Sequence, residues 1–286
     1  MTHSVASEPD WSNVRLEAEN DVHIWLIDSE KFAPQALSSE VEALFTDAER
    51  VRYTGYRFAR DRDRFLLSRW LRHVVLSHYL EHQYLGECAA FTTLTGSSLR
   101  LSKRGKPQFA GAGELPFGFS MSHSHPYVAL AVSLQPATGV DLELLPDQEV
   151  PSETWSGTAE AFFAADEIAW LNQHAAKDQY RCFLELWTLK ESVIKACDTT
   201  LHYALPEVVC YLAGGQPLVT MPSPRGKLTY THLQAVQCRV AQKCLLSVAI
   251  ASSKPVSSPS LKVFELSGRQ QFRRRSHQHV RFAAQR

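Results

Sequence analysis

The stretch Trp187-Thr188-Leu189-Lys190-Glu191-Ser192-Val193-Ile194-Lys195-Ala196 decides how this chain is interpreted. The surrounding segment, 178–198, contains no Gly or Pro and repeats apolar residues near helical spacing, so it is predicted to be a helix. Trp187, Glu191 and Lys195 are spaced four residues apart, which places them along one edge of that helix, about 6 Å from one to the next. One helical edge therefore presents an aromatic ring, a carboxylate and an ammonium group in a row.

A second short stretch, Gly139-Val140-Asp141-Leu142-Glu143, follows an apolar run and a Gln-Pro turn. If this stretch is extended, Asp141 and Glu143 project from one face while the apolar residues between them pack the other. Together with Glu191 and Lys195, these carboxylates suit a Mg²⁺ site that handles phosphates. Each motif alone also has a plain structural interpretation. A Glu–Lys pair at this spacing is commonly a solvated helical ion pair, and Asp-x-Glu is commonly the wet face of an edge strand.

In this order, Gly139-Val140-Asp141-Leu142-Glu143 and Trp187-x-x-Lys190-Glu191-Ser192-x-x-Lys195-Ala196 resemble the two signature motifs of the 4′-phosphopantetheinyl transferases. The chain length matches the larger, pseudodimeric (Sfp-type) branch of that family. The resemblance covers roughly residues 22–252 and implies an α+β fold, a pseudodimer of two similar α/β lobes. The lobes would be 1–138 and 139–252, with the active site in the cleft between them.

The resemblance also implies a reaction, the transfer of 4′-phosphopantetheine from coenzyme A to a serine of an apo acyl or peptidyl carrier protein, releasing 3′,5′-ADP. Asp141, Glu143 and Glu191 would hold Mg²⁺, and Asp141 would also lie against the cofactor. Lys195 would neutralise charge on the phosphate, and Glu191 is the candidate base for the serine hydroxyl. Lys190 projects about 100° away from Glu191 on the helix and is expected to face the cofactor's phosphates or solvent.

The most basic ordered stretch runs from Arg50 to Arg72, with eight arginines against two aspartates. Its apolar positions predict a long helix over 59–80, and several arginines would simply be the solvent side of that helix. Arginine nonetheless prefers fork-like contacts with phosphate. Family members use basic residues here for the 3′-phosphate of coenzyme A; Arg64 is matched to that role, with Arg60 and Arg50 as weaker candidates.

Two further segments resemble cofactor-binding motifs of the family. Gly105-Lys106-Pro107 predicts a turn, and its lysine would reach the cofactor's phosphates. Ser122 and His123, within Phe119-Ser120-Met121-Ser122-His123-Ser124, would bind a phosphate through a hydroxyl and an imidazole. A hydrolase nucleophile elbow would need a Gly where Ser122 stands, and a zinc site from His123 and His125 lacks a third ligand at convincing spacing.

Composition narrows the class of protein. Zero net charge over 286 residues argues against a molecule that binds nucleic acid over its whole surface. Six cysteines without metal or C-x-x-C spacing favour free thiols in a reducing cytosol. No leader and no apolar run of roughly 18 residues is found, so a cytoplasmic protein is predicted, and a monomer is expected. Residues 253–286 begin as a Ser/Pro-rich linker, end strongly basic and are predicted to form a disordered tail.

Two other functions remain open from the sequence. The first is a non-catalytic module that binds coenzyme A or carrier protein; the intact carboxylates and Lys195 count against it. The second is a nucleic-acid-binding protein that uses the arginine-rich stretch and the basic tail. Zero net charge and the lack of a nucleic-acid motif count against that function.

Overall fold

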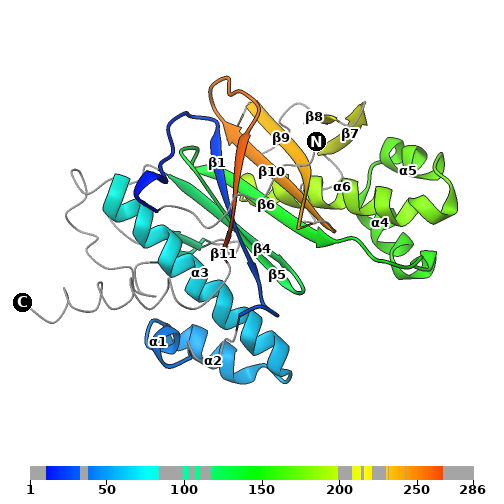
Figure 1. The fold of residues 1–286 in the computed structure, drawn as a ribbon. Helices are drawn as coiled ribbons and strands as arrows, with labels where there is room; N and C mark the ends of the chain where they lie inside the picture. The colour runs from blue at the N-terminus through cyan, green and yellow to red at the C-terminus, as the bar shows by residue number, and fades with distance from the viewer. Residues whose placement is uncertain are drawn as a thin grey trace, which may run out of the picture.

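Two β-sheets packed between two long helices form the fold of this chain (Figure 1). The computed structural model describes residues 11–32, 38–83, 99–102, 107–109, 117–198, 208–213, 216–220, 230, 232–241 and 243–266. None of the helices in these ranges is long and apolar enough to span a membrane.

The first sheet has four strands in the order β11-β1-β5-β4. Their bounds are Asp21–Asp28 for β1, Gly118–Ser124 for β4, Tyr127–Ser133 for β5 and Ser260–Leu266 for β11. β1 pairs antiparallel with β5 and parallel with β11, and β4 pairs antiparallel with β5. β4 therefore forms one edge of this sheet.

The second sheet has three antiparallel strands in the order β6-β10-β9. Their bounds are Ala137–Leu144 for β6, His232–Val240 for β9 and Cys244–Ser252 for β10. Two further pairs of antiparallel strands are formed by β2 (Leu99–Leu101) with β3 (Pro107–Phe109) and by β7 (Val209–Ala213) with β8 (Gln216–Thr220).

The two long helices lie on the outer faces of the two sheets, and the shorter helices pack beside them (Figure 1). Their bounds are Ser38–Glu42 (α1), Asp47–Gly55 (α2), Ala59–Gln83 (α3), Ser156–Phe162 (α4), Ala165–Asn172 (α5) and Ala176–Ala196 (α6). Short 3₁₀ turns occupy Trp11–Asn13 (η1) and Ser152–Thr154 (η4). The helices predicted at 59–80 and 178–198 are confirmed as α3 and α6.

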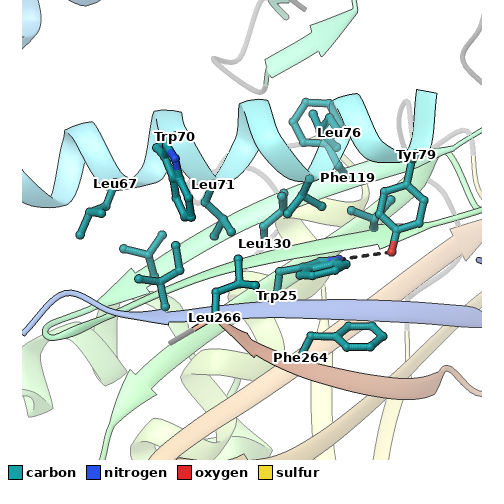
Figure 2. Close-up of a cluster of buried hydrophobic side chains, with 14 of the residues drawn as sticks. Trp25, Leu67, Trp70, Leu71, Leu76, Tyr79, Phe119, Leu130, Phe264 and Leu266 are labelled. Atoms are coloured by element: carbon teal, nitrogen blue, oxygen red, sulfur yellow. Dashed lines mark hydrogen bonds between the residues drawn. The ribbon is translucent and has the colours of Figure 1, made fainter. Parts of the chain in front are cut away.

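Alternation along the strands divides the interior into three cores. On β1, Trp25 and Ile27 face α3, whereas Ile24 and Leu26 face the second sheet. Figure 2 shows the first of these cores, with Trp25 beneath α3 and its indole Nε1 donating to Tyr79 Oη at 3.2 Å. The third core lies between the second sheet and α6. This layering fixes α6 against the strand that carries Asp141.

Two expectations about local structure are wrong. The apolar spacing from Pro34 to Ala48 predicts one short amphipathic helix, but the described part of this stretch holds α1 and the start of a second helix, α2. Thr46 caps α2 through a reciprocal pair of hydrogen bonds with Glu49. The tail predicted to be disordered from residue 253 contains β11, which pairs with β1. Phe264 of β11 stacks on Trp25 with ring centroids 4.6 Å apart, so burial of this apolar strand orders the segment.

Candidate active site

The site is assembled where α6 crosses β6. A Cβ atom built on Gly139 would lie 1.9 Å from the Ser192 carbonyl oxygen and 2.4 Å from the Ala196 amide nitrogen. The helix backbone therefore rests directly on the strand, and only Gly permits that approach. Because Glu191 and Lys195 flank this contact on the helix, they are brought beside the polar face of β6.

Asp141 is the central acceptor of the site and is 4% exposed. Its Oδ1 accepts from Lys195 Nζ at 2.6 Å and from Ser122 Oγ at 2.7 Å. Its Oδ2 is buried and has no hydrogen-bond partner in the part of the chain that the structure describes. Since a buried carboxylate oxygen is costly to leave unpaired, Oδ2 indicates a position for a ligand.

Glu143 and Glu191 complete a group of three acidic side chains. Desolvation, and then the neighbouring charge of Asp141, raises the pKa of Glu143 to about 7. Desolvation also raises the pKa of Glu191; Lys195 opposes this shift and Asp141 adds to it. The predicted alternation of β6 is confirmed, because Val140 and Leu142 pack into the core between the sheets. The carboxylates thus lie close enough to disfavour one another's charge.

His123 and Arg64 border the same site. The His123 side chain is exposed to solvent, so it is only partly desolvated. The pKa of His123 is nevertheless lowered, first by that desolvation and next by the positive charge of Arg64, with Lys195 contributing less. Arg64 also pairs with Asp61, its Nη2 being 3.1 Å from Oδ1. His123 is thus within electrostatic range of Arg64 on α3 and of Lys195 and Asp141 in the site.

Other arginines of the basic stretch hold local structure. Arg69 and Arg72 both pair with Glu49, at 2.6 and 3.0 Å, and so join α3 to α2. Arg50 donates to the Glu42 carbonyl at 2.9 Å, and the Arg60 guanidinium lies 5.4 Å from the Phe58 ring. These contacts do not link Arg50 or Arg60 to Asp141. Lys106 lies outside the described residues.

The structure corrects the prediction for Lys190, which does not face the cofactor site. Its side chain is 0% exposed, and its Nζ lies 2.6 Å from both Glu167 Oε2 and the Val208 carbonyl. Glu167 in turn accepts from the Ala164 and Cys210 amides. Rotation of about 100° from Glu191 carries this lysine inward, toward α5 and β7, where it serves packing. Sequence reasoning missed Glu167, because a partner 23 residues away leaves no local pattern.

Sequence reasoning also gave no role to Ser120 and Ser124, which flank Ser122 at alternate positions of β4. The Ser124 hydroxyl donates to Glu143 Oε2 at 2.9 Å, and Ser120 Oγ accepts from the Val140 amide at 3.1 Å. The Ser-x-Ser-x-Ser alternation was the available signal, since it places three hydroxyls on one face of a strand.

The acidic group suits a hard divalent cation in chemistry, although no three His, Cys, Asp or Glu side chains of the described ranges form a ready-made metal cage. Asp141 Oδ2 is unpartnered, and burial is the main cause of the raised pKa values of Glu143 and Glu191; a bound cation would satisfy the first and oppose the second. Oxygen donors of this kind are what Mg²⁺ prefers, and Mg²⁺ commonly takes only one or two protein carboxylates together with phosphate oxygens and waters.

The known proteins that are similar to this chain share one description. Residues 137–239, which include β6 and α6, match the family model of the 4′-phosphopantetheinyl transferase superfamily. A putative 4′-phosphopantetheinyl transferase of Synechocystis is 26% identical over 65% of this chain and 68% of its own length. The 4′-phosphopantetheinyl transferase psf-1 of Bacillus pumilus is 27% identical over 72% of this chain and 81% of its own. AcpT of Escherichia coli K12, also a 4′-phosphopantetheinyl transferase, is 30% identical over 43% of this chain and 65% of its own length.

Residues 137–239 are thus identified as a 4′-phosphopantetheinyl transferase superfamily domain, and the chain is similar to proteins of that name over up to 72% of its length. The matched domain contains Asp141, Glu143, Glu191 and Lys195, the residues that the structure brings together.

Proposed function

We propose that this protein transfers the 4′-phosphopantetheine group of coenzyme A to a serine hydroxyl of an apo carrier protein. The observation that carries the proposal is the group formed by Asp141, Glu143, Glu191 and Lys195 where α6 rests on β6. Three carboxylates and an ammonium in the same region are suited to a pyrophosphate ester, whose reaction depends on positioning and on compensation of charge.

In the proposed reaction the serine oxygen attacks the β-phosphorus that bears the pantetheine. The bond between that phosphorus and the bridging pyrophosphate oxygen breaks, and 3′,5′-ADP leaves. Glu191 takes the serine proton; its raised pKa makes it a better proton acceptor than an ordinary surface glutamate. Lys195, which in this structure contacts Asp141 Oδ1 and Ser122, is within reach of charge that builds on the phosphate oxygens.

The residues that would hold Mg²⁺ are Asp141, through its unpartnered Oδ2, together with Glu143 and Glu191. When bound, Mg²⁺ would polarise the pyrophosphate and neutralise its charge. His123, Ser122 and Arg64 would bind phosphate oxygens of coenzyme A, with Arg64 assigned to the 3′-phosphate. Lys106 and Arg60 remain predicted contributors to the same cofactor.

We further propose two lobes that meet near residue 138, one built on α3 and the first sheet and the other on α6 and the second. The separate cores beneath the two helices support this division. The chain beyond 252 returns to the N-terminal lobe through β11. A cytoplasmic location and a monomeric state are part of the proposal; the five cysteines of the described ranges are buried free thiols, which suits a reducing compartment.

Intact-mass spectrometry tests the function. The protein is incubated with coenzyme A, Mg²⁺ and an apo acyl or peptidyl carrier protein, and the carrier is expected to gain one phosphopantetheine group on its serine. Asp141→Asn and Glu191→Gln should remove the gain, whereas Glu185→Gln, on the same helix but paired with Arg181, should retain it. Coenzyme A binding without any transfer to a panel of carriers would favour the non-catalytic binding module instead.

A further inference from the structure

β4 and β6 are edge strands that contact one another without a backbone ladder. β4 pairs with β5 and β6 pairs with β10, and the two strands belong to different sheets. Three serines of β4, at positions 120, 122 and 124, bridge the gap, and each reaches an atom of β6. Side-chain hydroxyls thus replace backbone hydrogen bonds where the carboxylates lie.

Ser120 and Ser124 each accept a hydrogen bond from a backbone amide of β6. The Val140 amide donates to Ser120 Oγ at 3.1 Å, and the Leu144 amide donates to Ser124 Oγ at the same distance. Only Ser124 also donates its own proton to a carboxylate, Glu143 Oε2, at 2.9 Å. Ser124 therefore holds both the backbone that follows Glu143 and one carboxylate oxygen of Glu143, whereas Ser120 holds only the backbone at Val140.

We infer that Ser124 is a positioning residue that orients the Glu143 carboxylate toward a divalent cation shared with Asp141. The inference rests on the proposed function, because it assigns Glu143 as a cation ligand. A hydrogen bond to one carboxylate oxygen restricts rotation of the side chain and leaves the other oxygen available for the cation. Loss of such an outer contact at metal sites typically weakens metal binding by about 10- to 100-fold.

Ser120 supplies the matched control. Ser120→Ala and Ser124→Ala each remove a hydroxyl that accepts a hydrogen bond from a backbone amide of β6, so both should lower thermal stability. Only Ser124→Ala removes the bond to Glu143. Ser124→Thr keeps a hydroxyl and should recover most of the effect.

The test is a titration with Mn²⁺ in the presence of coenzyme A and without carrier protein, followed by electron paramagnetic resonance of the free ion. Ser124→Ala is expected to weaken Mn²⁺ binding by about 10-fold or more, while Ser120→Ala stays near the unsubstituted protein and Ser124→Thr lies between. In transfer kinetics, the Mg²⁺ concentration that gives the half-maximal rate should be highest for Ser124→Ala, intermediate for Ser124→Thr, and near that of the unsubstituted protein for Ser120→Ala.

Equal Mn²⁺ affinity in the Ser120→Ala and Ser124→Ala proteins would overturn the inference while leaving the proposed function intact. Failure of the unsubstituted protein to bind Mn²⁺ with coenzyme A, together with absent transfer, would overturn the proposed function and the inference with it.

Discussion

Gly139→Ala isolates the contact on which the site depends. The added Cβ would lie 1.9 Å from the Ser192 carbonyl oxygen, whereas ordinary van der Waals contact begins at 3.4 Å. Both atoms that it meets, Ser192 O and Ala196 N, belong to the backbone of α6, so no side-chain rotation can relieve the clash. The helix must retreat from β6 by about 1.5 Å, and the 2.6 Å contact between Lys195 Nζ and Asp141 Oδ1 would open beyond hydrogen-bond range.

A misplacement of about 1 Å at a reacting group costs on the order of 100-fold in rate. We therefore expect Gly139→Ala to lower kcat for phosphopantetheine transfer by about 100-fold or more, measured per folded molecule after urea denaturation. Overpacking should also cost about 1–3 kcal/mol of unfolding free energy.

Gly118→Ala is the matched control. Its Cβ would lie 2.3 Å from the Gln135 carbonyl oxygen, a clash of the same kind in the turn before β6 and away from α6. It should lose comparable stability and far less kcat. A Gly139→Ala protein that is destabilised but transfers at the rate of the unsubstituted protein would refute the assignment of this contact.

Three more predictions concern individual side chains. Lys190→Met leaves Glu167 buried without its counter-charge, so urea denaturation should show a loss of about 3–5 kcal/mol in the free energy of unfolding, while the KM for coenzyme A stays unchanged. A raised KM without loss of stability would instead place Lys190 in the cofactor site. In competition assays, Arg64→Ala should weaken the binding of coenzyme A by about 10-fold and the binding of 3′-dephospho-coenzyme A much less. Equal losses of affinity for the two ligands would mean that the 3′-phosphate binds elsewhere. Because the pKa of Glu143 is raised to about 7, calorimetry should find that cation binding releases protons below pH 7 and weakens as pH falls. Without cation, the same raised pKa stabilises the fold at low pH, and that stabilisation is lost as pH rises through about 7.

Local patterns predicted the elements of the site but not their surroundings. The spacing of Glu191 and Lys195 and the alternation through Asp141 and Glu143 are local properties, and both appear in α6 and β6 as expected. The assignment of Lys190 failed because helical spacing gives an angle but does not say which direction is buried. Glu167, its partner, lies on another helix.

The C-terminal strand illustrates a different difficulty. Residues 260–266 follow a Ser/Pro-rich segment and precede a basic one, so composition favoured disorder over the whole region. Their order depends on Trp25, more than 230 residues earlier, against which Phe264 stacks. A strand that pairs with one at the other end of the chain has no local signal beyond its own short alternation.

The most direct test of the account is a crystal of the protein grown with coenzyme A and Mn²⁺, examined by anomalous scattering at the manganese edge. We expect one peak in contact with Asp141 Oδ2, Glu143 and Glu191, beside the pyrophosphate. A peak bound to the pyrophosphate without contact to Asp141, or a coenzyme A bound away from the junction of β6 and α6, would contradict it.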